Sequence, residues 1–127
     1  MGLKAMQKLL PVVLLLLAGC AASARQSSIG YPSALAALED LKSKPGVELR
    51  EEMGWTVATD RAAYTVWSFT PVGHPAHPAA VKRIVTEKDG AVWMDTKVLC
   101  QATRAACDQL VEDFKQLNER TRQSMQR

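Results

Sequence analysis

The chain has 127 residues, with 16 basic and 13 acidic side chains, a formal charge of +3, two histidines and three cysteines. This length is sufficient for one domain and excludes a large multidomain protein. No basic block interleaved with aromatic residues is present, which argues against a nucleic acid partner.

Residues 1–19 have the pattern of an export signal. Lys4 and Lys8 precede an apolar run from Leu9 to Ala18, in which no polar position appears at the helical spacing that a buried core helix would show. As a helix this run rises only about 15 Å, roughly half of the hydrocarbon core of a bilayer. We therefore expect a signal peptide that is removed, leaving 108 residues with a formal charge of +1.

The apolar run ends in Leu17-Ala18-Gly19-Cys20, which resembles the lipobox of bacterial lipoprotein precursors. The resemblance implies cleavage before Cys20, a diacylglyceryl thioether on its sulfur, and a further acyl chain such as palmitate on its new amino group. Two or more acyl chains anchor a protein stably, so the membrane is an expected partner through the lipid. In Gram-negative lipoproteins an aspartate after the cysteine retains the product in the inner membrane. Ala21 therefore implies the periplasmic face of the outer membrane.

The remainder divides into a tether and one domain. Residues 20–30 comprise the lipidated cysteine and a stretch of small and polar residues without periodicity, which as a flexible coil spans about 17 Å. Residues 31–127 are expected to form a single α+β domain in the periplasm.

Two segments of this domain have helical periodicity. The first runs from Tyr31 to Lys44, with Pro32 at its first helical position, and ends at Pro45-Gly46. The second runs from Thr103, a candidate N-cap, to Arg122, and its polar end beyond Arg120 is expected to fray. The apolar stripes of the two helices comprise Tyr31, Ala34, Leu35, Leu38 and Leu41, and Cys107, Leu110, Val111, Phe114 and Leu117.

Five β-runs lie between the helices, at residues 47–52, 55–59, 64–70, 81–88 and 91–99. The pair Asp89-Gly90 between the last two is the strongest hairpin signal in the chain. Consecutive strands joined by short turns form an antiparallel meander. The sequence therefore predicts an α+β fold, a five-stranded antiparallel meander sheet flanked by an N-terminal and a C-terminal helix.

The hairpin registers predict which residues share a face of this sheet. A two-residue turn at Asp89-Gly90 pairs Val85 with Met94, and Thr59 opposite Tyr64 would pair Val57 with Val66. One face of the last hairpin is then core, with Val81, Val85, Val92, Met94 and Val98. The reverse face gives a candidate binding face of Trp67, Phe69, Ile84 and Trp93. The alternative is that one helix covers each face.

The remaining cysteines are expected to form a disulfide. Cys100 and Cys107 are an even pair in a protein that the signal directs to an oxidising compartment. The closed loop of about eight residues contributes roughly 2.5 kcal/mol of stability in the chain-entropy model. Two separate buried thiols are the alternative, and the six intervening residues differ from the spacing of a redox motif.

Both histidines lie in the proline-rich stretch at residues 70–80. Their spacing of three makes His74 and His77 a weak candidate for a metal site. Each precedes a proline, which favours extended backbone and separates positions three apart by about 9 Å. No further ligand is adjacent in the sequence, so we expect a rigid connector, and neither a metal ion nor another cofactor.

Residues 67–83, WSFTPVGHPAHPAAVKR, are similar to stretches in small uncharacterised envelope proteins of proteobacteria, a resemblance that implies no activity. No nucleophile or carboxylate is visibly placed beside either histidine, so we expect no enzyme, and an envelope hydrolase is only the third hypothesis. The expected function is non-catalytic binding of an envelope protein or polymer, or assistance in envelope assembly. The alternative is an inhibitor or immunity protein that acts against a cell-wall hydrolase or toxin.

Overall fold

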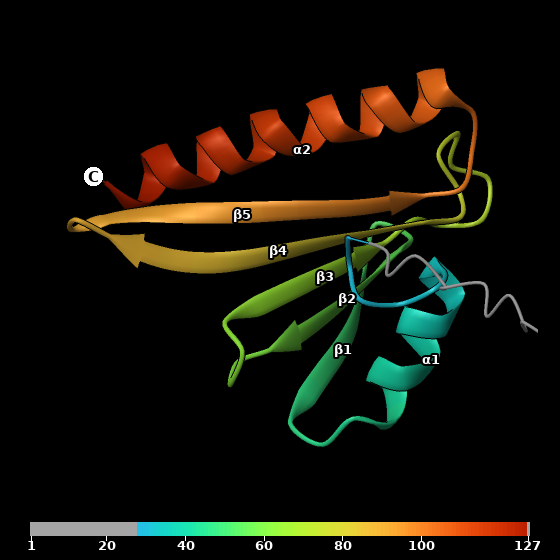
Figure 1. Cartoon of the computed structure of the whole chain (residues 1–127), viewed down its shortest axis with the longest axis horizontal. Coiled ribbons are helices and arrows are strands. Elements are labelled where there is room, and N and C mark those ends of the chain that lie inside the picture. Colours follow the sequence, from blue (N-terminus) through green and yellow to red (C-terminus); the bar gives the residue numbers. More distant parts are fainter. Residues whose placement is uncertain (1–27, 127) are drawn as a thin grey trace, which may run out of the picture.

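The computed structural model describes residues 28–126, so the predicted signal peptide, Cys20 and most of the predicted tether lie outside the described residues. The described part is a five-stranded antiparallel meander in the order β1-β2-β3-β4-β5, with one helix before it and one after it (Figure 1). The α+β fold predicted from the sequence is confirmed. The elements are α1 (Ala34–Ser43), β1 (Val47–Glu52), β2 (Trp55–Asp60), β3 (Thr65–Phe69), β4 (Ala79–Lys88), β5 (Ala91–Cys100) and α2 (Arg104–Met125).

The helices begin at hydroxyl caps. Ser33 Oγ accepts a hydrogen bond from the Ala36 amide at 3.0 Å, so α1 begins after Ser33 and not at the predicted Pro32. Thr103 caps α2 as predicted, with its hydroxyl 3.3 Å from the Ala106 amide nitrogen. Among the described residues, neither helix is both long enough and apolar enough to span a membrane.

The end of α2 differs from its prediction. The helix continues to Met125 instead of fraying beyond Arg120. Arg122 explains the extension because its guanidinium hydrogen-bonds to Glu119 at 2.9 Å and lies 5.5 Å from the ring centroid of Trp93 on β5. The last turns are therefore attached to the sheet, and the bond to Arg122 lowers the pKa of Glu119.

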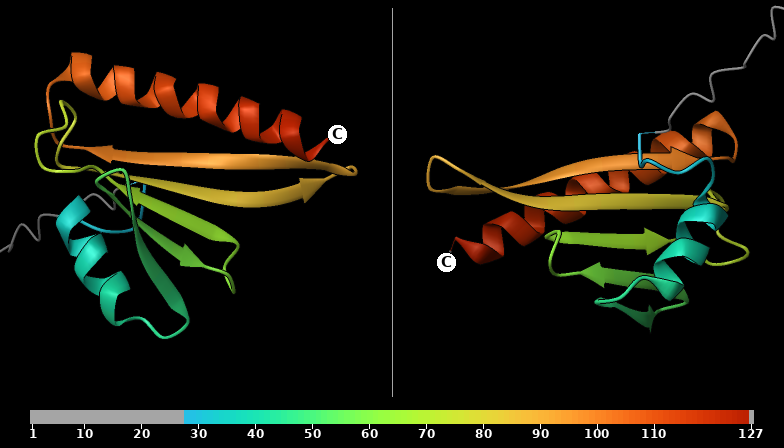
Figure 2. Two further views of the ribbon diagram at one scale, coloured as in Figure 1. Left: turned by 180° about the vertical axis from the view of Figure 1, so that it is seen from behind. Right: turned by 60° about the horizontal axis from the view of Figure 1, so that its bottom comes forward.

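The two helices lie on opposite faces of the sheet. In the right-hand view of Figure 2, α1 lies in front of the strands and α2 behind them. Each helix covers its own apolar cluster, and the sheet is the layer between them. The α1 cluster contains Ile29, Ala34, Ala37, Leu41, Ala58, Trp67, Phe69 and Ala80, and the α2 cluster contains Ala76, Ala79, Val81, Leu110 and Phe114.

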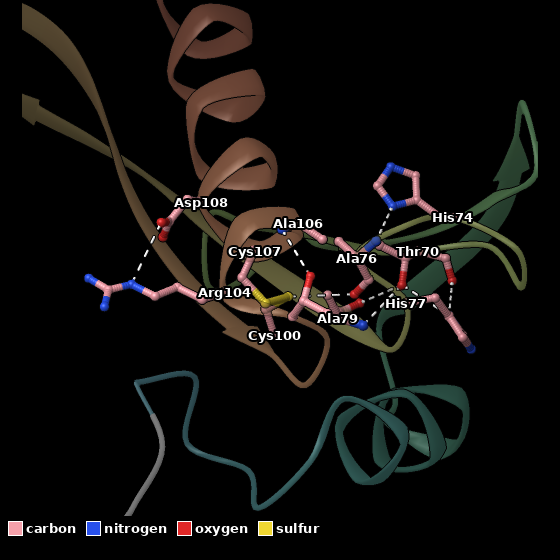
Figure 3. Close-up of a disulfide and its surroundings, with 11 residues drawn as sticks. Thr70, His74, Ala76, His77, Ala79, Cys100, Arg104, Ala106, Cys107 and Asp108 are labelled. Carbon is pink, nitrogen blue, oxygen red and sulfur yellow. Dashed lines mark hydrogen bonds and ion pairs between the residues drawn. A yellow bond between two sulfur atoms is a disulfide. The ribbon is translucent and has the colours of Figure 1, made fainter.

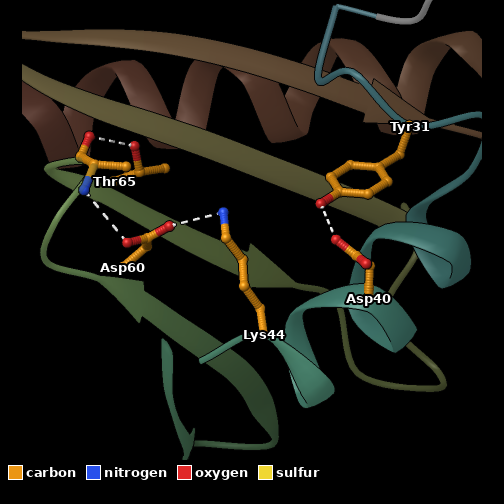
Figure 4. A network of polar contacts seen from close by, with 6 residues as sticks. Tyr31, Asp40, Lys44, Asp60 and Thr65 are labelled. Carbon is orange, nitrogen blue, oxygen red and sulfur yellow. Dashed lines mark hydrogen bonds and ion pairs between the residues drawn. The ribbon is translucent and has the colours of Figure 1, made fainter. Parts of the chain in front are cut away.

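Two polar contacts lie on the α1 side of the domain (Figure 4). Lys44 Nζ, at the end of α1, lies 3.2 Å from the carboxylate of the buried Asp60 on β2. The hydroxyl of Tyr31 donates a hydrogen bond to Asp40. This bond, together with partial burial and the negative charge of Asp40, raises the pKa of Tyr31 to about 12.

The predicted register is correct for one hairpin and wrong for the other. Val85 is opposite Met94 and Val81 opposite Val98, as predicted. Val57, however, pairs with Ser68 and not with Val66. The shift arises because Asp60 extends β2: its carboxylate is bound by Lys44 and also accepts a hydrogen bond from the Ala63 amide, which begins the turn. A shift of two residues leaves every side chain on its predicted face.

The β4–β5 hairpin projects beyond the other strands (Figure 1). Pairing between β3 and β4 extends only as far as Thr65 opposite Ile84, so the residues of β4 after Ile84 have β5 as their only strand neighbour. This projection explains why Val85, predicted to be core, is 36% exposed, whereas Val81 is fully buried. Half-buried Val92, Met94 and Val98 complete the predicted core row.

Cys100 and Cys107 form a disulfide, as predicted, which joins the end of β5 to the start of α2 (Figure 3). Their Cα atoms are 5.7 Å apart. The short loop between them therefore fixes the point from which α2 turns back along β5.

Replacing both Cys100 and Cys107 with alanine should lower the free energy of unfolding by about 2.5 kcal/mol, because the unfolded polypeptide loses a covalent loop. Urea unfolding of the oxidised protein and of the double variant measures this difference. Reduction of the wild-type protein is the control and should produce a similar loss. Equal stability of the oxidised, reduced and double-variant proteins would contradict the prediction.

Candidate functional site

The predicted aromatic binding face is closed where Trp67 and Phe69 lie. Each of these side chains is only 4% exposed. Their rings are stacked with centroids 6.2 Å apart, and Tyr31 contacts Trp67 edge-on at 5.7 Å. The small side chains of α1 that face the sheet let the helix approach closely enough to cover both rings. The prediction that these two residues lie on an open face is therefore wrong, and the alternative of one helix on each face holds here.

The other two residues of that predicted face lie further out. Ile84 is half-buried, and Trp93 is 50% exposed on the projecting hairpin. Trp67 is opposite Lys82 of β4, and Trp93 is opposite Thr86 of the same strand. The two tryptophans are therefore offset by about 13 Å along the strand direction. Arg122 also lies over the ring of Trp93. The four residues therefore do not form one continuous aromatic patch.

The histidines belong to the connection between β3 and β4, as predicted (Figure 3). His77 Nδ1 lies 3.1 Å from both the hydroxyl and the carbonyl oxygen of Thr70. His74 Nδ1 accepts a hydrogen bond from the Ala76 amide at 3.0 Å. The described residues contain no group of three or more His, Cys, Asp or Glu side chains that could hold a metal ion.

A different site lies on the α2 face. On this side of the sheet α2 runs alongside β5 (Figure 1), and the strands beyond are covered unevenly, because Val57 on β2 and Ser68 on β3 are buried whereas Arg50 on β1 is exposed. A groove of about 380 Å³ lies between the helix and these strands, and its volume falls within the usual range of ligand sites. We call it the α2 groove. Its lining consists of Arg50, Glu52, Met53, Trp55, Val57, Ser68, Arg83, Asp113, Phe114, Leu117 and Arg120.

The strand registers explain why the sheet residues of this groove converge. Arg50 is opposite Val57, Val57 opposite Ser68, and Ser68 opposite Val81, so these positions share one face of the sheet. Arg83, two residues after Val81, points to the same face. On α2, the lining residues recur at helical spacing from Asp113 to Arg120, which places them on the side of the helix towards β1–β3.

Two aromatic rings form the apolar part of the α2 groove. Phe114 is 7% exposed and contacts Trp55 edge-on, with ring centroids 5.8 Å apart. The ring of Trp55 also contacts that of His74, with centroids 5.1 Å apart. The histidine connection therefore supports the position of Trp55, which places an apolar surface beside the charged part of the groove.

Arg83 is the most unusual side chain of the groove. Its guanidinium carbon lies 5.3 Å from the centroid of the Phe114 ring. Its Nε atom is buried and has no hydrogen-bond partner among the described residues. Burial lowers the pKa of Arg83, Glu52 partly offsets this effect, and Arg50 lowers the pKa further. A partly buried cation with an unused donor is costly unless another group satisfies it.

The other charges of the groove leave a small positive excess. Arg50 forms an ion pair with Glu52 at 3.1 Å, and Asp113 accepts a hydrogen bond from Gln109. Arg120 forms no ion pair within the described part of the protein. Three arginines face two carboxylates in the lining, so the groove carries a formal excess of one positive charge.

Sequence patterns did not reveal this groove, because the valine-rich face of the last hairpin was predicted to be core throughout. Arg83 lies between Val81 and Val85 in the alternating pattern and shares their face. A single arginine within a row of inward-facing valines is the signal that could have identified the site.

No protein-family model matches the sequence, and neither the curated proteins nor the solved structures yielded a significant match.

Proposed function

We propose that this protein is a non-catalytic binding protein of the bacterial envelope that uses the α2 groove to hold a partner. It is anchored through lipid on Cys20 at the periplasmic face of the outer membrane and serves envelope binding or assembly. The anchor and the location rest on the lipobox resemblance. The binding function rests on one observation, which is that the guanidinium of Arg83 lines a groove walled by aromatic rings and has no hydrogen-bond partner among the described residues.

The chemistry of the groove favours binding. Its lining supplies guanidinium donors and two aromatic rings, and Ser68 is its single hydroxyl among the described residues. Arginine and aromatic side chains are the residue types that contribute most often to hot spots of protein interfaces. A groove of this kind fits an extended segment of a partner protein.

Site-specific photocrosslinking in intact cells tests this function. Met53 is 94% exposed at the edge of the α2 groove and can be replaced by p-benzoylphenylalanine. Tyr64 is the matched control, because it is also an exposed turn residue with positive φ but does not line the groove. We expect a defined crosslinked protein from position 53 and none from position 64.

Mass spectrometry identifies the captured protein, and its binding is then measured with purified components. If the partner is a cell-wall hydrolase or toxin whose activity falls on stoichiometric binding, the inhibitor or immunity function applies instead. Crosslinks of the same pattern and yield from both positions, or from neither, would refute binding at the groove.

A further inference from the structure

We propose that the α2 groove recognises a peptide segment that presents one carboxylate beside an apolar side chain. The carboxylate would bind the guanidinium of Arg83, and the apolar side chain would pack against Trp55 and Phe114. This proposal rests on the proposed binding function and adds the chemistry of the partner.

The guanidinium of Arg83 identifies the anion site, because it lines the α2 groove and, of its donor atoms, only Nε is buried. The guanidinium carbon of Arg83 lies over the ring of Phe114, and a ring supplies no conventional hydrogen-bond acceptor for its N–H groups. Arg83 donates no hydrogen bond to another described residue. A carboxylate can accept two parallel N–H bonds from the two Nη atoms of this planar fork, and such a charge-assisted bond is stronger than one between neutral groups.

The charges of the groove favour a carboxylate over a phosphate. A formal excess of one positive charge matches a single negative charge. A phosphate group carries about two negative charges near neutral pH and would meet Glu52 and Asp113 in the same lining. A monoanion therefore complements the groove better than a phosphorylated ligand does.

The aromatic walls define the second half of the ligand. Phe114 contacts both Trp55 and Arg83, so the apolar surface and the anion site are adjacent. An amino acid with an apolar side chain and a free carboxylate is the smallest ligand that reaches both. The carboxyl terminus of a polypeptide, or an acidic residue next to an apolar one, presents this combination in a protein.

N-acetylphenylalanine is a suitable probe, because it carries one carboxylate and one aromatic ring. N-acetylphenylalanine amide is the uncharged matched ligand, and phenyl phosphate carries the ring with a phosphate. Each is titrated into the ¹⁵N-labelled full-length protein in a non-ionic detergent. The side-chain N–H signal of Arg83 reports on the anion site, and that of Trp55 reports on the apolar surface. Each signal is assigned by its disappearance from the spectrum of the variant Arg83→Lys or Trp55→Phe.

We expect N-acetylphenylalanine to shift both signals in a saturable manner and to bind at least about ten-fold more tightly than its amide, as a charge-assisted bond predicts. Arg83→Gln should weaken the probe by a similar factor, and Arg83→Lys, which keeps the charge but loses the fork, by less. Arg61→Gln is the control, because Arg61 is an exposed arginine outside the groove. Phe114→Leu should weaken the acid and the amide alike, which provides a second test if Arg83→Gln does not fold.

Equal affinity for the acid and the amide would overturn the assignment of Arg83, and tighter binding of phenyl phosphate would overturn the choice of a carboxylate. An Arg83 signal that does not move at any probe concentration would also overturn the proposal. These outcomes are independent of the crosslinking result. A captured partner with no response to the probe would leave the binding function standing and remove only the ligand chemistry.

Discussion

Trp67→Ala is expected to lower the free energy of unfolding by about 3–5 kcal/mol, since Trp67 is 4% exposed and its ring fills the space between α1 and the sheet. Its indole ring contacts the rings of Phe69 and Tyr31, and Lys82 Nζ lies 5.1 Å from its centroid. Urea unfolding of the purified protein measures the loss. Trp67→Phe should lose less, because it retains one ring.

Trp93→Ala is the matched control for this substitution. Trp93 is 50% exposed, and its clearest contact is with the guanidinium of Arg122, so its truncation should cost less than about 1 kcal/mol. Equal losses for the two alanine variants would mean that α1 does not cover the sheet as described. A small loss for Trp67→Ala alone would mean that this face is open after all.

Cys20→Ser is expected to abolish lipidation completely, because the thiol sulfur is the atom that takes the diacylglycerol in proteins with a lipobox. Cells that express this variant should accumulate an uncleaved precursor that carries no radioactive fatty acid. Labelling with radioactive palmitate, followed by electrophoresis, measures both effects. The double variant Cys100→Ala, Cys107→Ala is the control and should keep the label, since those cysteines form the disulfide.

A Cys20→Ser protein that is still cut before residue 20 and still floats with membranes would contradict the lipoprotein assignment. The lipobox and Cys20 lie outside the residues that the structure describes, so this experiment, and not the fold, bears on the anchor.

Local signals in the sequence were sufficient to predict the meander. Asp89-Gly90 indicated the correct β4–β5 register, and Thr103 indicated the correct start of α2. The shift at β2–β3 had a tertiary cause that local patterns do not contain. Asp60 is a poor strand residue, yet it extends β2 because Lys44, sixteen residues earlier, binds its carboxylate.

The candidate site was not predicted for a similar reason. Alternation along the strands placed Trp67 and Phe69 on the correct face, but which helix covers which face depends on how the backbone crosses the sheet. The wrong face was therefore predicted to be open. The groove beside α2 follows from the path of that helix along β5, which leaves Arg50 on β1 exposed while Val57 on β2 and Ser68 on β3 are buried.

The proposed binding of a partner in the α2 groove through Arg83 can be measured in intact cells. The measurement is the yield of the crosslink from position 53, compared between the wild-type background, Arg83→Gln and Arg61→Gln. We predict that Arg83→Gln lowers the yield by about ten-fold at equal protein level, as expected for the loss of a charge-assisted hydrogen bond, and that Arg61→Gln leaves it unchanged. An undiminished yield from the folded Arg83→Gln protein would show that Arg83 does not hold the partner.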